Sequence, residues 1–309
     1  MSLIEQAAKR LEELRRSGVE ISDRTPAHVA SDHLSTPEAL VQPLDARGDS
    51  ASFRRPQRSA HADSTHRHVD LDFTALKAHG FVTPDASKSQ IADEFRVLKR
   101  PIIRNALGRN GVRVKGGNLI MVTSALPGEG KTFTSVNLAL SIAMEVDSRV
   151  LLVDGDVAHP AIPTLLGVPH GPGLLDLLTR DDLDFADALV RTNVDKLSVL
   201  PAGTRHHRAT ELLASDQMVG LLRELASRYS DRIVIFDSPP LLATTEARVL
   251  ATHMGQIVMV VAADATSHHA VEQALATIEA CEIVLMALNK AGRTEVGTYY
   301  GYYGNDDAA

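Results

Sequence analysis

NLIMVTSALPGEGKTFTSVNLALSIA, residues 118–143, decides the fold class of this chain. Its first part is an apolar run of strand length, its middle contains Gly128 and Gly130, and its last part repeats apolar residues at helical spacing. A strand, a tight glycine turn and a helix in this order are typical of a phosphate-binding loop, because glycine lets backbone N–H groups face an anion and the helix N-terminus attracts negative charge. The alternative is an ordinary strand-to-helix turn, and a Gly-Lys-Thr triplet alone would not exclude it.

The residue types in this loop predict its ligand. Lys131 is expected to hold the β- and γ-phosphates, and Thr132 to offer its hydroxyl to Mg²⁺, so we expect ATP bound as its magnesium complex. The general motif begins with glycine six residues before the lysine, where this chain has Ala125. The residues predicted to bind the nucleotide here are Pro127, Gly128, Glu129, Gly130, Lys131, Thr132 and Phe133.

Further apolar runs of strand length follow the loop. They read RVLLVD, LSVLPA, RIVIFD, QIVMVVAAD and IVLMALN, and most are separated by stretches long enough for a helix. Near-continuous apolar runs indicate strands buried on both faces. The predicted fold is therefore α/β, a mostly parallel central sheet with helices on both faces.

Two of these runs end in aspartate. VLLVDGD contains Asp154 and Asp156, and IVIFDSPP contains Asp237. Phosphoryl transfer needs carboxylates to hold Mg²⁺ and to orient or deprotonate the nucleophile. We predict that Asp237 acts on the metal through water, that Asp154 serves as a base or metal ligand, and that Asp156 is the third catalytic carboxylate. The alternative is that all three are helix caps or turn residues.

Composition excludes several classes of protein. With 309 residues, 44% of them hydrophobic and 23% charged, the chain has the make-up of a soluble globular protein. A net charge of -7 disfavours general nucleic-acid binding. No apolar run is long enough for a membrane helix, the first residues are too charged for a signal peptide, and Cys281 is the sole cysteine. These features predict a cytoplasmic protein.

The chain divides into four predicted segments. Residues 1–17 have the spacing of an amphipathic helix, and 18–67 form a polar stretch without apolar period, which predicts a disordered linker. Residues 68–295 are the predicted globular domain, in which Ser89–Asn105 reads as a surface helix interrupted at Pro101. Residues 296–309 form a glycine-rich tail with four candidate phosphoacceptors, and a sticky tail without chemistry is the alternative. The candidate phosphoacceptors are Tyr299, Tyr300, Tyr302 and Tyr303.

The pieces ALPGEGKT, LLVDGD and IVIFDSPP, with the terminal tyrosines, resemble the bacterial tyrosine kinases of the deviant-Walker P-loop type. The segments MSLIEQAAKRLEELRR and DEFRVLKRPIIRNA look more narrowly like the exosortase/PEP-CTERM-associated tyrosine autokinases of exopolysaccharide clusters. The resemblance implies ATP-dependent autophosphorylation of the tail in trans within a ring-like homo-oligomer. It also implies a role in regulating exopolysaccharide synthesis and export. The partners it implies are a transmembrane chain-length regulator, which would hold the kinase at the inner face of the membrane, and a tyrosine phosphatase.

The resemblance also carries over individual positions. Asp93, Arg96 and Lys99 occupy the frame of a Glu-x-x-Arg-x-x-Arg motif that forms subunit contacts in the family. Asn289 matches a position that presents an amide to adenine, and a turn residue is the alternative there. Where the family commonly has an arginine two residues after the second aspartate, this chain has Ala158.

A second class of protein competes with the kinase hypothesis. The deviant-Walker switch ATPases of partitioning and division-site systems hydrolyse ATP without phosphorylating protein. They carry a lysine five residues before the Walker lysine, and this chain has Leu126 there, which disfavours them. A module that only binds ATP is the third alternative.

Overall fold

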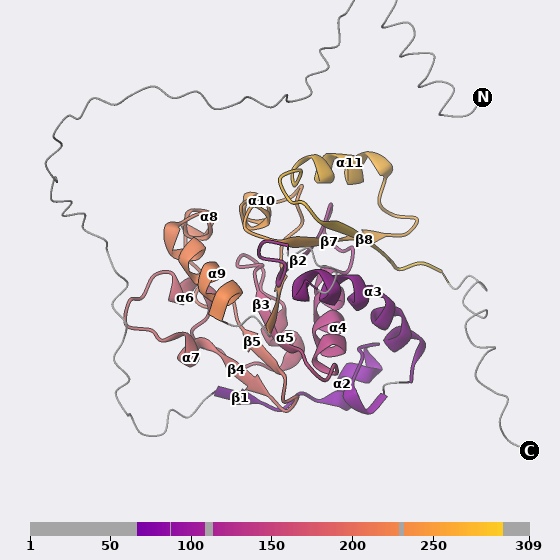
Figure 1. The fold of residues 1–309 in the computed structure, drawn as a ribbon, viewed down its shortest axis with the longest axis horizontal. Helices are drawn as coiled ribbons and strands as arrows, with labels where there is room; N and C mark the ends of the chain where they lie inside the picture. Colours follow the sequence, from indigo (N-terminus) through magenta and orange to yellow (C-terminus); the bar gives the residue numbers. More distant parts are fainter. Residues whose placement is uncertain (1–66, 87, 109–113, 229–231, 293–309) are drawn as a thin grey trace, which may run out of the picture. The chain divides into compact units, whose positions relative to one another are not determined.

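The computed structural model describes residues 67–86, 88–108, 114–228 and 232–292, and Figure 1 shows their arrangement. All of them belong to one compact unit of the chain, Ala60–Ala309. The predicted N-terminal helix and the tyrosine tail lie outside the described residues, as does the predicted linker apart from Arg67. Among the described helices, none has the length and apolar character needed to cross a membrane.

The core of the unit is an eight-stranded sheet in the order β1-β4-β5-β3-β6-β2-β7-β8. Neighbouring strands run parallel except β4 and β5, which are antiparallel. The strands are β1 (Arg67–Val69), β2 (Leu119–Ser124), β3 (Arg149–Asp154), β4 (Val190–Thr192), β5 (Leu197–Leu200), β6 (Arg232–Asp237), β7 (Gln256–Ala262) and β8 (Val284–Asn289).

The mostly parallel α/β fold predicted from the apolar runs is confirmed, because each of the six runs forms a strand. β1 and β4 were not predicted, since three residues are too few to show an apolar period. β1 begins at Arg67, one residue before the predicted domain.

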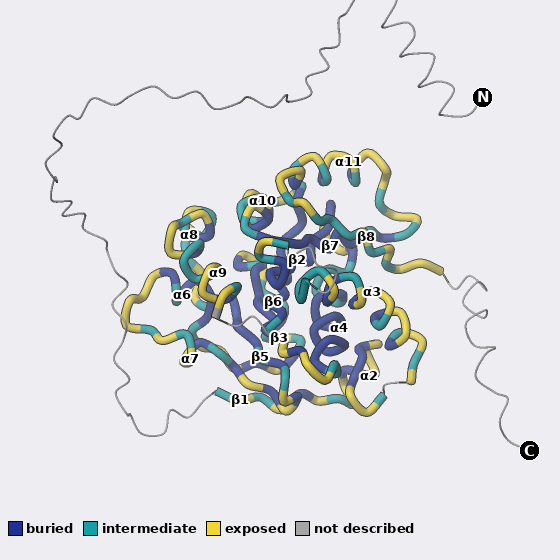
Figure 2. Tube along the Cα trace, in the orientation of Figure 1, coloured by how far each residue is buried: buried dark blue, intermediate teal, exposed yellow. Residues whose placement is uncertain are grey.

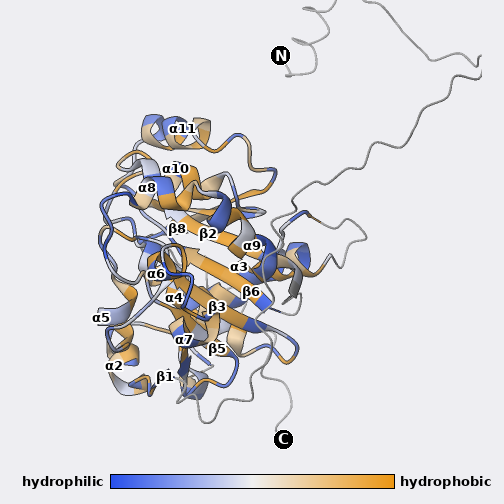
Figure 3. Cartoon of the chain, turned by 90° about the vertical axis from the view of Figure 1, so that its left-hand side faces the viewer, coloured by the Kyte–Doolittle hydropathy of each residue, from blue (hydrophilic) through white to orange (hydrophobic). Residues whose placement is uncertain are grey.

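Helices cover both faces of the sheet. The helices are α2 (Phe73–Ala78), α3 (Gln90–Leu107), α4 (Lys131–Ala143), α5 (Ile162–Leu166), α6 (Leu174–Leu177), α7 (Phe185–Ala188), α8 (Ala209–Leu213), α9 (Asp216–Arg228), α10 (Thr245–Ala251) and α11 (His268–Ala276), with a short 3-10 turn at Pro84–Ala86. One apolar cluster joins the sheet to α2–α5, and a second joins its other face to α6–α11. In Figure 2 the central strands are buried while the outer turns of α8 and α11 are exposed. Figure 3 shows the same strands as a hydrophobic layer inside the domain.

Helix α3 corrects one prediction. The sequence suggested an interruption at Pro101, yet the helix continues through it to Leu107. Proline removes the hydrogen bond to the carbonyl four residues earlier, at Val97, and Val97 is 74% exposed, so water can satisfy that carbonyl. Phe95 and Ile102 are buried in the core and hold the helix against the domain.

The parallel strands bring their carboxyl ends to one edge of the sheet. β6 lies between β3 and β2, so the end of the loop-bearing strand β2 is next to Asp237 of β6, and Asp154 of β3 lies one strand further along. Asp154 pairs in register with Asp237, and Asp237 pairs with Val122 of β2. This edge is where open α/β sheets bind ligands.

Candidate active site

The loop between β2 and α4 has the backbone of an anion-binding turn. Gly128 and Gly130 have φ of 80° and 99°, a region that favours glycine. A Cβ atom at Gly130 would lie 2.0 Å from Nδ2 of Asn289, so that position also requires glycine for space. Ala125, which replaces the first motif glycine, is not among the residues with positive φ, and its backbone therefore does not need glycine.

Helix α4 opens toward this loop without a side-chain cap. The N-cap residues of α3, α10 and α11 are Ser89, Thr244 and Ser267, and each accepts a hydrogen bond from the first turn. The N-cap of α4 is Gly130, which has no side chain to do so. The first N–H groups of α4 are therefore available to an anion, and the helix dipole favours one there.

The side chain of Glu129, which is only 3% exposed, holds the phosphate loop in place from inside the domain. Its carboxylate accepts hydrogen bonds from the backbone N of Leu126 at 2.6 Å and of Ala262 at 3.4 Å, and from the Thr266 hydroxyl. The Glu129 side chain thus fixes the loop to the end of β7. A contact between Glu129 and nucleotide would involve its backbone.

The end of β8 ties the loop from the other side. Nδ2 of Asn289 donates to the carbonyl of Glu129 at 2.8 Å, and Nζ of Lys290 donates to the carbonyl of Gly128 at 2.7 Å. These contacts place Asn289 beside the phosphate loop. Its adenine contact stays a prediction, and the structure adds a positioning role.

Asp154 and Asp237 form a pair of buried carboxylates at the strand ends. They are 0% and 1% exposed. One oxygen of Asp154 accepts from the backbone N of Ile162 at 3.1 Å, and Oδ1 of Asp237 accepts from the Ser135 hydroxyl at 2.9 Å. Their other oxygens, Oδ1 of Asp154 and Oδ2 of Asp237, have no hydrogen-bond partner among the described residues. Buried oxygens without partners are costly unless a ligand satisfies them.

The burial of the two carboxylates also raises their pKa values. Burial and, to a smaller extent, the charge of Asp237 raise the pKa of Asp154 to about 8. Burial also raises the pKa of Asp237 to about 6, although the neighbouring hydroxyls of Thr132 and Ser135 oppose the shift. Perturbed carboxylates at a sheet edge are typical of functional sites.

Asp156 lies between this pair and the surface. It is half-buried, and burial raises its pKa. Its Oδ1 accepts from the backbone N of His159 at 3.0 Å, and its charge interacts with those of Lys131 and Glu246. The structure therefore brings all three predicted aspartates to the site, at different depths.

These residues fit a magnesium ion. The two partnerless oxygens lie on adjacent strands, next to the helix that begins with Lys131 and Thr132. Among the described residues no three His, Cys, Asp or Glu side chains gather as a metal site. Mg²⁺ at nucleotide sites is commonly held by one or two protein oxygens, phosphates and water, and this site has the oxygens for it.

Two residues predicted to bind the nucleotide, Phe133 and Pro127, have side chains that pack against the core and lie exposed to solvent, respectively. The Phe133 ring packs against Phe81, with centroids 5.0 Å apart, and against Phe95 at 6.4 Å. Its side chain therefore anchors α4 in the core, and only its backbone can serve a phosphate. Pro127 is exposed at the tip of the loop.

The predicted subunit-contact residues lie on α3. Asp93 is exposed, Arg96 is half-buried, and the two side chains form an ion pair with each other. Lys99 is buried, donates to the carbonyl of Ser141 at 2.6 Å and pairs with Glu145 at 2.7 Å. Subunit contact stays a prediction for these positions, and Lys99 also joins α3 to α4.

Sequence reasoning missed three residues that build the site. Ser135 hydrogen-bonds Asp237, Lys290 holds the phosphate loop, and Ser238 donates to the carbonyl of Val122 at 3.1 Å. Ser135 lies one helical turn after Lys131, so the helix spacing could have identified it. Nothing in the sequence pattern marks the other two.

The fold and the site together define a P-loop nucleotide-binding protein. A family model described as an AAA domain matches residues 117–289, more than half of the chain. The chain is 32% identical over 221 residues to the tyrosine-protein kinase YwqD of Bacillus subtilis, which covers 71% of this chain and 89% of that relative. It is 29% identical over 225 residues to the putative tyrosine-protein kinase CapB of Staphylococcus aureus, covering 72% of this chain and 94% of that one.

A solved structure agrees with these relatives. The kinase domain of the Escherichia coli tyrosine kinase ETK superimposes with a TM-score of 0.59 at 26% identity, covering 74% of this chain and 91% of that chain. The chain therefore belongs to the bacterial tyrosine-protein kinase family, a family of enzymes. Some relatives are much longer: the putative tyrosine-protein kinase EpsB of Ralstonia nicotianae is 34% identical, and this chain spans 29% of it.

Proposed function

We propose that this protein is an ATP-dependent protein-tyrosine autokinase. The observation that carries the proposal is the pair of partnerless buried oxygens on Asp154 and Asp237, beside the uncapped N-terminus of α4. The helix N-terminus favours an anion and the carboxylate oxygens favour a cation, and a magnesium nucleotide supplies both to one site. Family membership makes tyrosine the acceptor that we propose.

Different residues of the site would have different roles in phosphoryl transfer. Backbone N–H groups of the loop and the ammonium of Lys131 hold the phosphates in line with the acceptor. Thr132 directly, and Asp237 through water, would hold Mg²⁺, which neutralises phosphate charge when bound. Asp154 would act as the base, or as a further ligand at the edge of the metal site.

In the chemical step, the acceptor phenol oxygen forms a bond to the γ-phosphorus of ATP. The bond from that phosphorus to the β–γ bridging oxygen breaks, ADP leaves, and the phenol proton passes to Asp154. A free phenol has a pKa of about 10, and a carboxylate whose pKa is raised by burial accepts such a proton more readily than an ordinary one. Asp156, closer to the surface, would orient the acceptor.

The acceptors that we propose are Tyr299, Tyr300, Tyr302 and Tyr303 of a neighbouring copy in a ring-like assembly. Glycines around them keep the segment extensible. Each phosphate would add roughly -1.5 to -2 charges near Asp306 and Asp307, so phosphorylated tails would repel one another and leave their docking surface. Phosphorylation would then favour disassembly of the ring.

We place this kinase in the regulation of exopolysaccharide synthesis and export. Support comes from the resemblance of its first residues and of α3 to the exosortase-associated autokinases. A transmembrane chain-length regulator would recruit it to the inner face of the membrane, and a tyrosine phosphatase would reverse its action. Deleting residues 1–17 tests the recruitment, since an unchanged membrane fraction would show that this segment is not the docking element.

Incubation with γ-labelled ATP and Mg²⁺ tests the activity. Label on tyrosine supports the proposal, phosphate release without label indicates a switch ATPase, and binding without turnover indicates a binding module. Replacing all four tail tyrosines with Phe should remove most of the label while ATP still binds. Label that persists on Tyr229 after this change would refute the tail assignment.

A further inference from the structure

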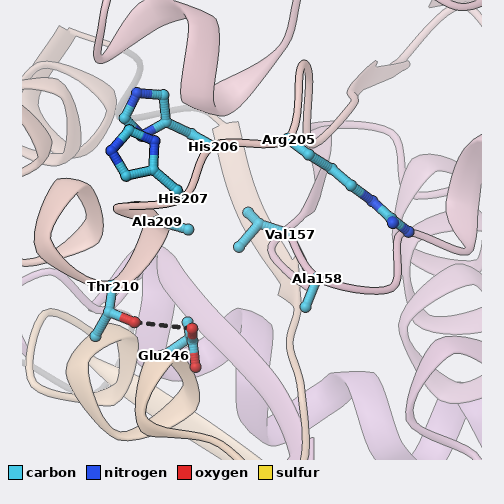
Figure 4. Close-up of a pocket in the computed structure, with 8 residues that line it drawn as sticks. All are labelled: Val157, Ala158, Arg205, His206, His207, Ala209, Thr210 and Glu246. Atoms are coloured by element: carbon cyan, nitrogen blue, oxygen red, sulfur yellow. Dashed lines mark hydrogen bonds between the residues drawn. The ribbon is translucent and has the colours of Figure 1, made fainter.

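A small hollow opens beside the candidate active site (Figure 4). Val157 and Ala158, which directly follow Asp156, line it. Glu246 lines it as well, and its charge interacts with that of Asp156. The charge of Lys131, the first residue of α4, also acts on Asp156. Asp156 is therefore close both to the hollow and to the end of the phosphate loop.

Arg205 brings a positive charge to one side of this hollow. It lies on the same side as Ala158, whereas Glu246 and the rings of His206 and His207 lie on the other (Figure 4). The two histidine rings stack on each other, with centroids 4.6 Å apart. Ala158 is exposed and contributes only a methyl group. The guanidinium of Arg205 is therefore the charged group on the side where Ala158 carries none.

The guanidinium of Arg205 is available to a ligand. The residue is exposed, and none of the described residues makes a hydrogen bond or an ion pair with that guanidinium. Arginine presents five N–H donors in a planar fork, which matches the oxygens of a phosphoryl group two at a time. A phosphoryl group is therefore a ligand that this side chain can hold.

The loop that carries Arg205 is anchored from inside the domain. The carboxylate of Asp176, which is 7% exposed, accepts hydrogen bonds from the backbone N of Gly173 and of Thr204, both at 2.9 Å. Gly203 has φ of 86°, and a Cβ atom there would lie 2.2 Å from that carboxylate. The backbone next to Arg205 is thus fixed before a ligand arrives, which lowers the entropy cost of binding.

The size of the hollow limits what it can hold. Its volume is about 170 Å³. Pockets for small ligands and cofactors usually span about 300 to 1,000 Å³. A whole nucleotide is therefore too large for it. The hollow suits one end of a nucleotide whose other phosphates lie on the phosphate loop.

Phosphoryl transfer benefits from a cation at this position. The transition state spreads negative charge over the three outer oxygens of the transferred group. Lys131 would act on this charge from the side of the phosphate loop, and the nearby carboxylates of Asp154 and Asp237 supply no positive charge. A guanidinium fixed on the opposite side stabilises the charge while the group separates from ADP.

We propose that Arg205 is a further catalytic residue, whose guanidinium donates hydrogen bonds to the γ-phosphoryl oxygens from the side of the hollow. The acceptor oxygen forms its bond to the γ-phosphorus, the bond to the β–γ bridging oxygen breaks, and the phenol proton passes to Asp154. Arg205 stays protonated throughout and gives up no proton. The inference rests on the proposed function and adds a residue to its chemical step.

The initial rate of autophosphorylation of the full chain tests this role. Arg205→Ala should lower the rate about a hundredfold or more, because the transition state loses a cation. Arg208→Ala is the matched control, since Arg208 is an exposed arginine on the same loop that does not line the hollow. Its rate should change less than about twofold. Equal rates for the two variants would overturn the inference.

A rescue variant tests the position of the guanidinium. Adding Ala158→Arg to the Arg205→Ala protein places a guanidinium on the same side of the hollow. This double variant should recover at least about tenfold of the lost rate. A double variant as slow as Arg205→Ala would show that a cation on this side of the hollow does not serve the reaction.

A transition-state analogue measures the same contact without any acceptor. Calorimetry gives the affinity for Mg²⁺-ADP with and without aluminium fluoride, which imitates the phosphoryl group during transfer. The natural protein should gain at least about tenfold in affinity from aluminium fluoride, and Arg205→Ala should lose most of that gain while binding Mg²⁺-ADP about equally well. An equal gain in both proteins, or no gain in the natural protein, would overturn the inference.

The two measurements separate this inference from the proposed function. A gain that depends on Arg205 in a protein that labels no tyrosine refutes the kinase assignment alone. Label that appears at the same rate in the natural and Arg205→Ala proteins refutes the role of Arg205 alone. A slower rate with an unchanged gain would mean that Arg205 acts on the acceptor, and this result would also refute its contact with the phosphoryl group.

Discussion

Asp154→Asn should stabilise the nucleotide-free protein. Asp154 is fully buried, its register partner is Asp237, and one of its oxygens has no partner among the described residues. Its pKa is raised to about 8, while in the unfolded chain it has the ordinary value near 4. The folded state therefore binds more protons than the unfolded state between these values, and stability falls as the pH rises through that window.

Each pKa unit corresponds to about 1.4 kcal/mol, and the pair shares its charge, so we expect a gain of about 2 to 4 kcal/mol at pH 8. The amide introduced by Asp154→Asn cannot ionise and can donate to Asp237. For a domain of this size the gain corresponds to a rise in Tm of roughly 5 to 10 °C. At pH 4 only a small part of the difference should remain, because the carboxyl is then protonated in the folded state and about half protonated in the unfolded chain.

Urea denaturation at pH 5 and pH 8, with a chelator present, measures this change. Asp181→Asn, at an exposed aspartate, controls for the loss of one negative charge. If the free energy of unfolding of the Asp154→Asn protein changed with pH as that of the natural protein does, or if the variant were less stable at pH 8, the assignment of Asp154 as a buried carboxylate with a raised pKa would be wrong.

Two other contacts give separate tests. Glu129→Ala should weaken binding of Mg²⁺-ADP about tenfold in calorimetry, because the N–H groups of Leu126 and Ala262 lose their acceptor and the loop loosens; unchanged affinity would show that the loop holds its shape without this anchor. Lys99→Met should lower the free energy of unfolding by about 2 to 4 kcal/mol, since it breaks a buried ion pair, whereas Arg96→Met, at a more solvent-accessible pair, should change it by less than about 0.5 kcal/mol. Equal losses at the two positions would contradict the burial of Lys99.

The sequence predicted six of the strands and the turn of the phosphate loop correctly, because each of these patterns has a single physical cause. Apolar runs ending in Asp154 and Asp237 predicted buried parallel strands, and parallel strands must bring their ends to one edge, so the meeting of these carboxylates followed from the pattern. Glycines next to Lys131 predicted the turn for an equally direct reason.

Contacts between distant segments could not be predicted in this way. The inward turn of Glu129 depends on Thr266 and Ala262, and the burial of Lys99 depends on Glu145. Such contacts arise from how helices pack, and no local spacing encodes them. The helix continues through Pro101 for a similar reason, since tertiary burial outweighed a local penalty.

A mass-spectrometric map of the tail tests the central claim most directly. The natural protein and the Lys131→Met protein are each expressed with the proposed transmembrane regulator, incubated with ATP and Mg²⁺, and digested. We predict phosphate on some of Tyr299, Tyr300, Tyr302 and Tyr303 in the natural protein and on none of them in the variant. Bare tyrosines in a natural protein that has consumed its ATP would contradict the account.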